Sequence, residues 1–329
     1  MKAILNHLFT HKKLSRREAE EVLTNIGQGI YNESEIAAFM SVYIMRSVSV
    51  DELAGFRDAL LSLCLHVDFP EDTIDLCGTG GDGKDTFNIS TLSSFVVAGA
   101  GGKVAKHGNY GVSSTCGSSN VMEYLGYKFT NDLDTLRRQL DKAGIFMMHA
   151  PLFHPAMKHV APIRKKLAVK TFFNMLGPMV NPAMPNYQMV GVFSLELARL
   201  YQYIYQQTNK NYLILHSLDG YDEISLTGKF KVIANRLENV LSPADLGMRQ
   251  VHPSELFSGG TVEEAARIFR NVLENNATEA QKNAVLANSG MAIKCLNPRF
   301  SFEESILAAK ESIESGKALF AFKTLLENQ

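Results

Sequence analysis

The stretch CGTGGDGKDTFNIST, which begins at Cys77, has the residue types and spacing of a phosphate-binding turn. Its glycines from Gly78 to Gly83 fit the dinucleotide pattern G-x-G-x-x-G. Gly78, Gly83 and Lys84 also fit the P-loop pattern, except that Asp85 occupies its last position. Glycines between a strand and a helix let backbone N–H groups approach an anion at the helix N-terminus. A tight turn without a ligand is the alternative.

Neither familiar ligand of such a turn fits well. A P-loop needs a hydroxyl after Lys84 to hold Mg²⁺, and Asp85 has none. A P-loop also has no acid inside the loop, where this chain has Asp82. A dinucleotide loop needs an acidic residue about 20 residues further on, where this chain has Lys106 and His107. Cationic groups there favour a ligand with more phosphate. Such an anion could be contacted by the side-chain amide of Asn88 and by the hydroxyls of Thr86, Ser90 and Thr91.

A second loop rich in small residues, KHGNYGVSSTCGSS, starts at Lys106. Like the first loop, it follows a predicted strand and precedes a predicted helix. Because ligands bind at the carboxyl ends of parallel strands, we expect both loops to lie at one edge of a sheet. Together they could surround a ligand that carries phosphate at both ends.

Two adjacent carboxylates, Asp222 and Glu223, follow the apolar stretch YLILH. Their position after a predicted strand places them at the same edge as the two loops. A dense polyphosphate needs a hard cation, and paired carboxylates can hold Mg²⁺ on the ligand side. A solvated turn is the alternative for this pair.

A basic segment, HPAMKHVAPIRKKL, begins at His154. Such a run is usually a solvated surface. As an anion site it would suit a second substrate, because Arg164 could make a two-pronged match to a carboxylate.

The elements that must position these residues change along the chain. The first part predicts helices only, with capping boxes at Ser15–Glu18 and Ser49–Glu52. After Thr73, short apolar strands alternate with loops and helices, which predicts a mainly parallel sheet. The predicted strands are 73–77, 102–108, 188–193, 212–216 and 229–234, and the predicted helices among them include 90–101 and 195–208. Prolines divide 151–186 into short helices and turns, and capping boxes at Thr278 and Ser301 begin further helices.

The length and composition of the chain indicate a globular protein. The chain has 329 residues, a length typical of about two domains, and 46% of them are hydrophobic. A net charge of −1 argues against general binding to nucleic acid. The four cysteines form no C-x-x-C pair, which suits a reducing compartment, and no apolar run reaches the roughly 20 residues of a membrane span. We therefore expect a soluble cytoplasmic protein.

The ordered set of motifs resembles the anthranilate phosphoribosyltransferase family over nearly the whole chain. The motifs are GTGGD at 78–82, TFNIST at 86–91, KHGN at 106–109, GSS at 117–119, HPAMKHVAPIR at 154–164, FNMLGP at 173–178 and DEIS at 222–225. The resemblance implies transfer of phosphoribose from phosphoribosyl pyrophosphate to the amine of anthranilate in tryptophan synthesis. Pyrophosphate would be released.

The resemblance also implies roles for individual residues. The residues matching phosphoribosyl pyrophosphate contacts are Gly78, Gly81, Asp82, Thr86, Asn88, Ser90, Thr91, Lys106, Ser114 and Ser118. Those matching anthranilate contacts are Gly78, Asn109, His154 and Arg164. Ser90, Asp222 and Glu223 match ligands of Mg²⁺, with two ions expected. No general base is assigned, although His107 and His154 are candidates.

The family fold is a small all-helical domain and a larger α/β domain like that of nucleoside phosphorylases. On this basis residues 1–68, joined by part of about 160–186, form the helical domain, and 69–159 with 187–329 form the α/β domain. A homodimer through the helical domain is expected. Two alternatives stand beside this interpretation: a pyrimidine nucleoside phosphorylase of the same fold, and a non-catalytic relative that binds nucleic acid. The chain departs from the family pattern at Tyr110, Asn120, Ala168 and Lys170.

Overall fold

The computed structural model describes residues 1–111 and 116–329 and divides the chain into two compact units. The helical unit comprises Met1–Val67 and Ala150–Met184, and the α/β unit comprises Asp68–His149 and Pro185–Gln329. The predicted boundary near 159 differs from the observed one at His149. Residues 150–159 belong to the helical unit because the strand that ends at His149 is followed at once by short helices.

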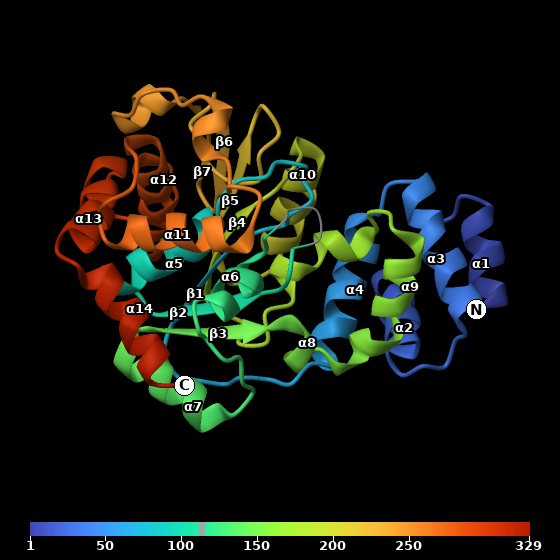
Figure 1. The fold of residues 1–329 in the computed structure, drawn as a ribbon. Helices are drawn as coiled ribbons and strands as arrows, with labels where there is room; N and C mark the ends of the chain where they lie inside the picture. Colours follow the sequence, from blue (N-terminus) through green and yellow to red (C-terminus); the bar gives the residue numbers. More distant parts are fainter. Residues whose placement is uncertain (112–115) are drawn as a thin grey trace. The chain divides into compact units, whose positions relative to one another are not determined.

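The helical unit is built from four longer helices and the short helices of the proline-rich segment (Figure 1). The longer helices are α1 (Lys2–Phe9), α2 (Arg16–Gly27), α3 (Glu33–Met45) and α4 (Val50–Ser62). The short ones are α8 (Ala150–Phe153), η1 (Pro155–His159), α9 (Ala161–Leu167), η2 (Phe172–Met175) and η3 (Gly177–Met179). Aromatic rings form the core of this unit: Phe56 stacks on Phe172 with centroids 4.4 Å apart, and Phe39 contacts both edge-on.

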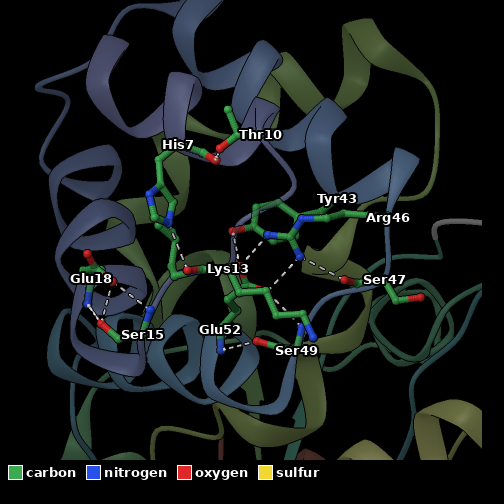
Figure 2. Close-up of polar contacts among 11 residues, drawn as sticks. His7, Thr10, Lys13, Ser15, Glu18, Tyr43, Arg46, Ser47, Ser49 and Glu52 are labelled. Carbon is green, nitrogen blue, oxygen red and sulfur yellow. Dashed lines mark hydrogen bonds and ion pairs between the residues drawn. The ribbon is translucent and has the colours of Figure 1, made fainter.

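The predicted capping boxes at Ser15 and Ser49 are present, and the second one continues into a buried charge network. Figure 2 shows Glu52, whose side chain is 0% exposed, among its donors. Arg46 donates to both carboxylate oxygens, at 2.5 and 3.0 Å, and the Leu14 and Ser49 amides donate at 3.0 and 2.9 Å. Tyr43 donates through its hydroxyl at 3.2 Å. Burial opposes ionisation of Glu52, but these donors outweigh it and lower its pKa.

Replacement of Glu52 by glutamine is expected to destabilise the helical unit by about 2–3 kcal/mol at pH 7, since it leaves Arg46 partly buried without its counterion. A lowered folded-state pKa stabilises the protein above the usual carboxyl pKa of 4.5, and this stabilisation is lost as the pH falls through the folded-state value. The difference between the two proteins should therefore narrow below pH 4.5. Urea unfolding of both proteins at pH 7 and pH 4 measures this difference in the free energy of unfolding. Glu33→Gln, which breaks an exposed pair with Lys166, is the control and should change stability by less than about 0.5 kcal/mol.

The α/β unit contains a seven-stranded sheet in the order β3-β2-β1-β4-β5-β6-β7. The strands are β1 (Ile74–Gly78), β2 (Val104–Gly108), β3 (Ile145–His149), β4 (Tyr187–Gly191), β5 (Asn211–Ser217), β6 (Phe230–Ala234) and β7 (Leu237–Leu241). The strand pairs from β3 to β5 are parallel, whereas β5 pairs antiparallel with β6 and β6 antiparallel with β7. The mainly parallel sheet that the sequence predicts is confirmed, and β3 and β7 are additional strands.

Helices cover the sheet on both faces, with α5 and α12 on one face and α10 on the other (Figure 1). The helices are α5 (Ile89–Gly99), α6 (Ser118–Tyr124), α7 (Leu133–Ala143), α10 (Leu195–Tyr205), α11 (Val262–Leu273), α12 (Glu279–Leu296), α13 (Phe302–Glu314) and α14 (Lys317–Glu327), with η4 (Pro243–Leu246) and η5 (Pro253–Leu256) between β7 and α11. The predicted capping boxes at Thr278 and Ser301 begin α12 and α13. In the described part of the chain, no helix is both long and apolar enough to cross a bilayer.

The strand order fixes where a ligand can bind. The chain adds β2 and β3 on one side of β1, then returns to place β4 and β5 on the other side. Ligands of open α/β sheets bind at the carboxyl ends of the strands where the order reverses. In this unit that place is the end of β1 and β4.

Candidate active site

The loop after β1 is held in shape by glycines. Gly80, Gly81 and Gly83 have φ of +67°, +79° and +74°, which L-residues with side chains rarely adopt. The Thr79 amide donates to the carbonyl of Gly191 at the end of β4, 2.9 Å away. The loop therefore lies across the two strand ends at the reversal point.

The acidic pair meets this loop directly. Asp222 Oδ2 accepts the Gly80 amide at 2.7 Å, and Glu223 Oε1 accepts the Ser90 amide at 2.9 Å. Ser90 lies in the first turn of α5, so Glu223 caps that helix N-terminus. The sequence-based expectation that the 78–91 turn and the acids share one edge of the sheet is confirmed.

Close packing explains two glycines at the strand ends. A Cβ on Gly78 would lie 2.3 Å from Asp222 Oδ2, and a Cβ on Gly191 would lie 1.3 Å from the Asp222 carbonyl oxygen. A side chain at either position would overlap Asp222, so glycine is required at both for the acidic loop to pack against the ends of β1 and β4. The glycine at the end of β1 was predicted from its motif, whereas Gly191 was not.

The two side chains of the acidic pair are held close together where ionisation is unfavourable. Burial, followed by the charges of Glu223 and Asp82, raises the pKa of Asp222 well above its usual range. Glu223 keeps some exposure to solvent, yet its surroundings raise its pKa to about 7, with desolvation the largest cause. Two carboxylates that resist ionisation side by side form a site suited to a hard divalent cation. Among the described residues, no group of three or more His, Cys, Asp or Glu side chains is arranged so that it could hold a metal ion.

Lys106 lies inside the sheet rather than on its surface. Its side chain is 1% exposed, and Nζ donates to the carbonyl of Leu76 in β1 at 2.6 Å. Burial lowers its pKa, while the nearby carboxylates of Asp75 and Glu223 raise it. The ammonium group therefore places a positive charge close to the acidic pair. The carboxylate of Asp75, also buried, accepts the amide of His107 at 3.3 Å.

The second loop lies beside the first. Asn88 donates from its side chain to the carbonyl of Cys116 at 3.0 Å, which ties the loop after β1 to the loop after β2. Ser118 Oγ and the Ser119 amide both donate to the carbonyl of Asn109, each at 3.2 Å. Ser114, a predicted contact in this loop, lies outside the described residues.

Two departures from the family pattern have structural roles here. Asn120 accepts the amides of Gly111 and Gly117 at 3.1 and 3.0 Å, and so holds the two ends of the second loop. Tyr110 donates from its hydroxyl to Glu123 at 2.9 Å.

The predicted anthranilate residues Arg164 and His154 belong to the helical unit. Arg164 is half-buried on α9, donates to Asn174 Oδ1 at 3.4 Å, and lies over the Phe173 ring, 5.5 Å from its centroid. No acidic side chain forms an ion pair with it in the part of the chain that the structure describes, and burial lowers its pKa. His154 is buried before η1. Ala168, which ends α9, has φ +52°, the left-handed conformation in which the family's glycine is easily accommodated.

Comparison with known proteins defines the class first. Residues 2–64 match the family described as glycosyl transferase family, helical bundle domain, and residues 70–319 match its a/b domain. These matches correspond to a helical bundle joined to an α/β domain with a mainly parallel sheet, as the sequence predicts.

The relatives define the family within that class. The chain is 61% identical over 329 residues to the anthranilate phosphoribosyltransferase of Flavobacterium psychrophilum, covering 99% of this chain and 98% of the relative. It is also similar to the anthranilate phosphoribosyltransferase of Saccharomyces cerevisiae in complex with PRPP and Mg (TM-score 0.91, 27% identity, 98% and 96% of the two chains). The same yeast enzyme in complex with 4-fluoroanthranilate gives a TM-score of 0.87 at 27% identity, with the same coverage.

The chain belongs to the anthranilate phosphoribosyltransferase family. It transfers the phosphoribosyl group of phosphoribosyl pyrophosphate to the amine of anthranilate, releasing pyrophosphate, in tryptophan biosynthesis. The family and activity predicted from the sequence are confirmed, and this assignment replaces both the nucleoside phosphorylase and the nucleic-acid-binding alternatives.

Sequence reasoning missed residues that support the site rather than form it. Asp75, Ser217 and Asn288 are buried polar side chains that contact the loops or the acidic segment. Asp75 stands in an apolar strand, where a charged residue is a signal of a buried partner. No sequence signal connects Asn288 with the acids, because it lies 64 residues after the segment that it contacts.

Proposed function

We propose that the loops after β1 and β2 bind phosphoribosyl pyrophosphate at the reversal point of the sheet. The observation that carries this proposal is the pair of hydrogen bonds from Gly80 and Ser90 to Asp222 and Glu223. They bring the phosphate-type loop, a helix N-terminus and the acidic pair to one place. The side chains and amides proposed to contact this substrate belong to Gly78, Gly81, Asp82, Thr86, Asn88, Ser90, Thr91 and Ser118, together with Ser114 outside the described residues.

Lys106 acts, in this proposal, through its charge. Because its ammonium group is buried and bonded to Leu76, we assign it an electrostatic contribution to the negatively charged substrate rather than a direct hydrogen bond. A cation fixed in a low-dielectric interior acts over longer distances than one in water.

Two Mg²⁺ ions are proposed to be held by Asp222 and Glu223, with the Ser90 hydroxyl as a further ligand. The raised pKa values of the two acids fit this role, because each carboxylate is held in surroundings that favour a counter-charge. When bound, Mg²⁺ neutralises the charge that builds on the departing pyrophosphate.

Anthranilate is proposed to be bound by Arg164, Asn109, His154 and the backbone of Gly78. Arg164 provides a guanidinium without an acidic partner among the described residues, which suits the anthranilate carboxylate. Asn109 is exposed at the end of β2 and can orient the amine.

The protein's own contribution to the reaction is then positioning. The loops fix C1 of the ribose by holding the phosphates on either side, while the anthranilate residues direct the amine at it. The C1–O bond to pyrophosphate breaks with its electrons leaving on pyrophosphate, and the N–C1 bond forms. The amine, made acidic by its bond to C1, then loses one proton to water. Positioning alone can lower such a barrier by several kcal/mol, on the order of 10²-fold or more in rate. We assign neither His107 nor His154 as the proton acceptor.

The test of these contacts is a crystal structure with phosphoribosyl pyrophosphate, Mg²⁺ and anthranilate. The expected result is electron density for the diphosphate against residues 78–91 and for metal against Asp222 and Glu223. Density for the diphosphate elsewhere on the sheet would contradict the proposal.

A homodimer through the helical unit is also proposed. Apolar side chains at the ends of α1 and α3, two helices that pack together, are exposed: Phe9, Ile44 and Met45, the last of them 87% exposed. We take these exposed apolar side chains as part of the surface through which the dimer forms. We further place the enzyme in the cytoplasm, which suits the four free cysteines.

Light scattering coupled to size exclusion should give twice the chain mass of 36.4 kDa for the natural protein. Ile44→Glu with Met45→Glu should give a monomer, because two carboxylates would be buried in the interface. Leu307→Glu, at a residue 63% exposed on α13, is the control and should leave the dimer intact. A monomeric natural protein would contradict the proposal.

A further inference from the structure

Asn288 is a buried amide in the middle of α12 that contacts the acidic segment. Its side chain is 1% exposed, and Oδ1 accepts the amide of Ile224 at 3.1 Å. Nδ2 donates to the carbonyl of Ile224 at 2.9 Å and to the carbonyl of Ala284, one turn earlier in α12, at 2.8 Å. One side chain therefore satisfies both backbone groups of the residue that follows Glu223.

Ser217, the last residue of β5, holds the backbone of the same segment through separate hydrogen bonds. Its hydroxyl donates to the carbonyl of Glu223 at 2.7 Å, and the Ser225 amide approaches it at 3.4 Å. The segment 223–225 is thus bonded to β5 and to α12. Since α12 also packs against β4 and β5, the acidic pair is tied to the core of the sheet through two different elements.

Asparagine is a costly choice for this position. It forms helix less readily than alanine, and a buried amide destabilises the protein further unless it is hydrogen-bonded. The neighbouring Ser289 is also buried, but its hydroxyl donates to the carbonyl of Val285 within the same helix, at 2.7 Å. Among the described residues, the hydrogen bonds that the Asn288 side chain makes outside its helix go to Ile224, so its effect falls on the acidic segment.

We propose that Asn288 is a positioning residue for the metal-binding acids, fixing the backbone of Ile224 so that the Asp222 and Glu223 carboxylates stand at the reversal point of the sheet. This inference rests on the proposed metal role of the two acids. A displacement of about 1 Å in such a site can reduce the rate on the order of 10²-fold.

Asn288→Ser tests the inference. A serine hydroxyl can donate to the carbonyl of Ala284, as Ser289 does to Val285, but it is too short to reach Ile224. In the metal-free protein, the peptide covering 217–227 should exchange its amide hydrogens faster than in the parent. The Mg²⁺ concentration for half-maximal rate and the KM for phosphoribosyl pyrophosphate should rise about tenfold or more, while the KM for anthranilate at saturating co-substrate stays within about twofold. Asn288→Ala should behave in the same way, and Ser289→Ala should change none of these quantities.

The Asp222→Ala/Glu223→Ala protein is measured beside these variants. If it loses Mg²⁺-dependent turnover while a folded Asn288 variant keeps the parent's exchange rate and Mg²⁺ requirement, Asn288 does not position the acids and the proposed metal role stands. If the double variant keeps Mg²⁺-dependent turnover, the metal role fails and this inference fails with it. Faster exchange and a raised Mg²⁺ requirement in Asn288→Ser, with a normal Ser289→Ala protein, support the inference.

Discussion

Replacement of Asp222 and Glu223 together by alanine is expected to lower kcat/KM by about 10³-fold or more and to remove its dependence on Mg²⁺. The two carboxylates are the acids that meet the Gly80 and Ser90 amides at the strand ends, and both have raised pKa values in this position. A metal ion that stabilises charge on a leaving group contributes several kcal/mol, and each 1.4 kcal/mol corresponds to about tenfold in rate. Steady-state rates over a range of Mg²⁺ concentrations measure the loss.

The matched control is Asp219→Asn in the same loop. Asp219 is exposed and accepts a hydrogen bond from Thr227, so it contributes to the loop but not to the acidic pair. This variant should keep a rate within about threefold of the parent and the same Mg²⁺ requirement. Thermal unfolding establishes that the double variant is folded. A folded double variant with the parent's rate would remove both acids from the mechanism.

Local signals in the sequence predicted most of the elements. Side-chain caps at Ser15, Ser49, Thr278 and Ser301 define helix starts because each satisfies a backbone amide of its own helix. The strand β3 was missed because its four apolar residues, followed by His149, begin directly after Gly144, which caps the end of α7, and such a short run has no period that distinguishes strand from helix. The edge strand β7 was missed because its three middle residues, Glu238, Asn239 and Val240, are exposed and two of them are polar.

The part of the site that could be predicted consists of residues that directly follow the strands of the parallel sheet. Glycines and acids that follow parallel strands of one sheet lie at the same edge, so the proximity of Gly80 and Asp222, which follow β1 and β5, could be expected from sequence position. The burial of Lys106 could not, because a lysine in isolation predicts a solvated surface, and its partner Leu76 offers only a backbone carbonyl. The arrangement of Asn288 depends on how α12 packs on the sheet, which no local pattern in the sequence encodes.

Arg164 is expected to control the affinity for anthranilate rather than for phosphoribosyl pyrophosphate. Its guanidinium is half-buried, donates to the Asn174 side-chain oxygen and lies over the Phe173 ring. It forms no ion pair with an acidic side chain among the described residues. A buried cation without a counterion is costly, so an incoming carboxylate gains a charge-assisted pair of hydrogen bonds. Loss of such a pair corresponds to about 2–3 kcal/mol, or roughly 30- to 150-fold in affinity.

Arg164→Ala should therefore raise the KM for anthranilate by about 10²-fold, and that for phosphoribosyl pyrophosphate by less than about threefold. Arg164→Lys should recover only part of the loss, because an ammonium group cannot make the two-pronged contact. Lys165→Ala is the control, since Lys165 is the next residue on α9 and is exposed. Steady-state titration of each substrate at saturating levels of the other separates the two constants. An equal rise in both would mean that the alanine variant disturbs the helical unit, and Arg164 would then have no specific role in binding the carboxylate.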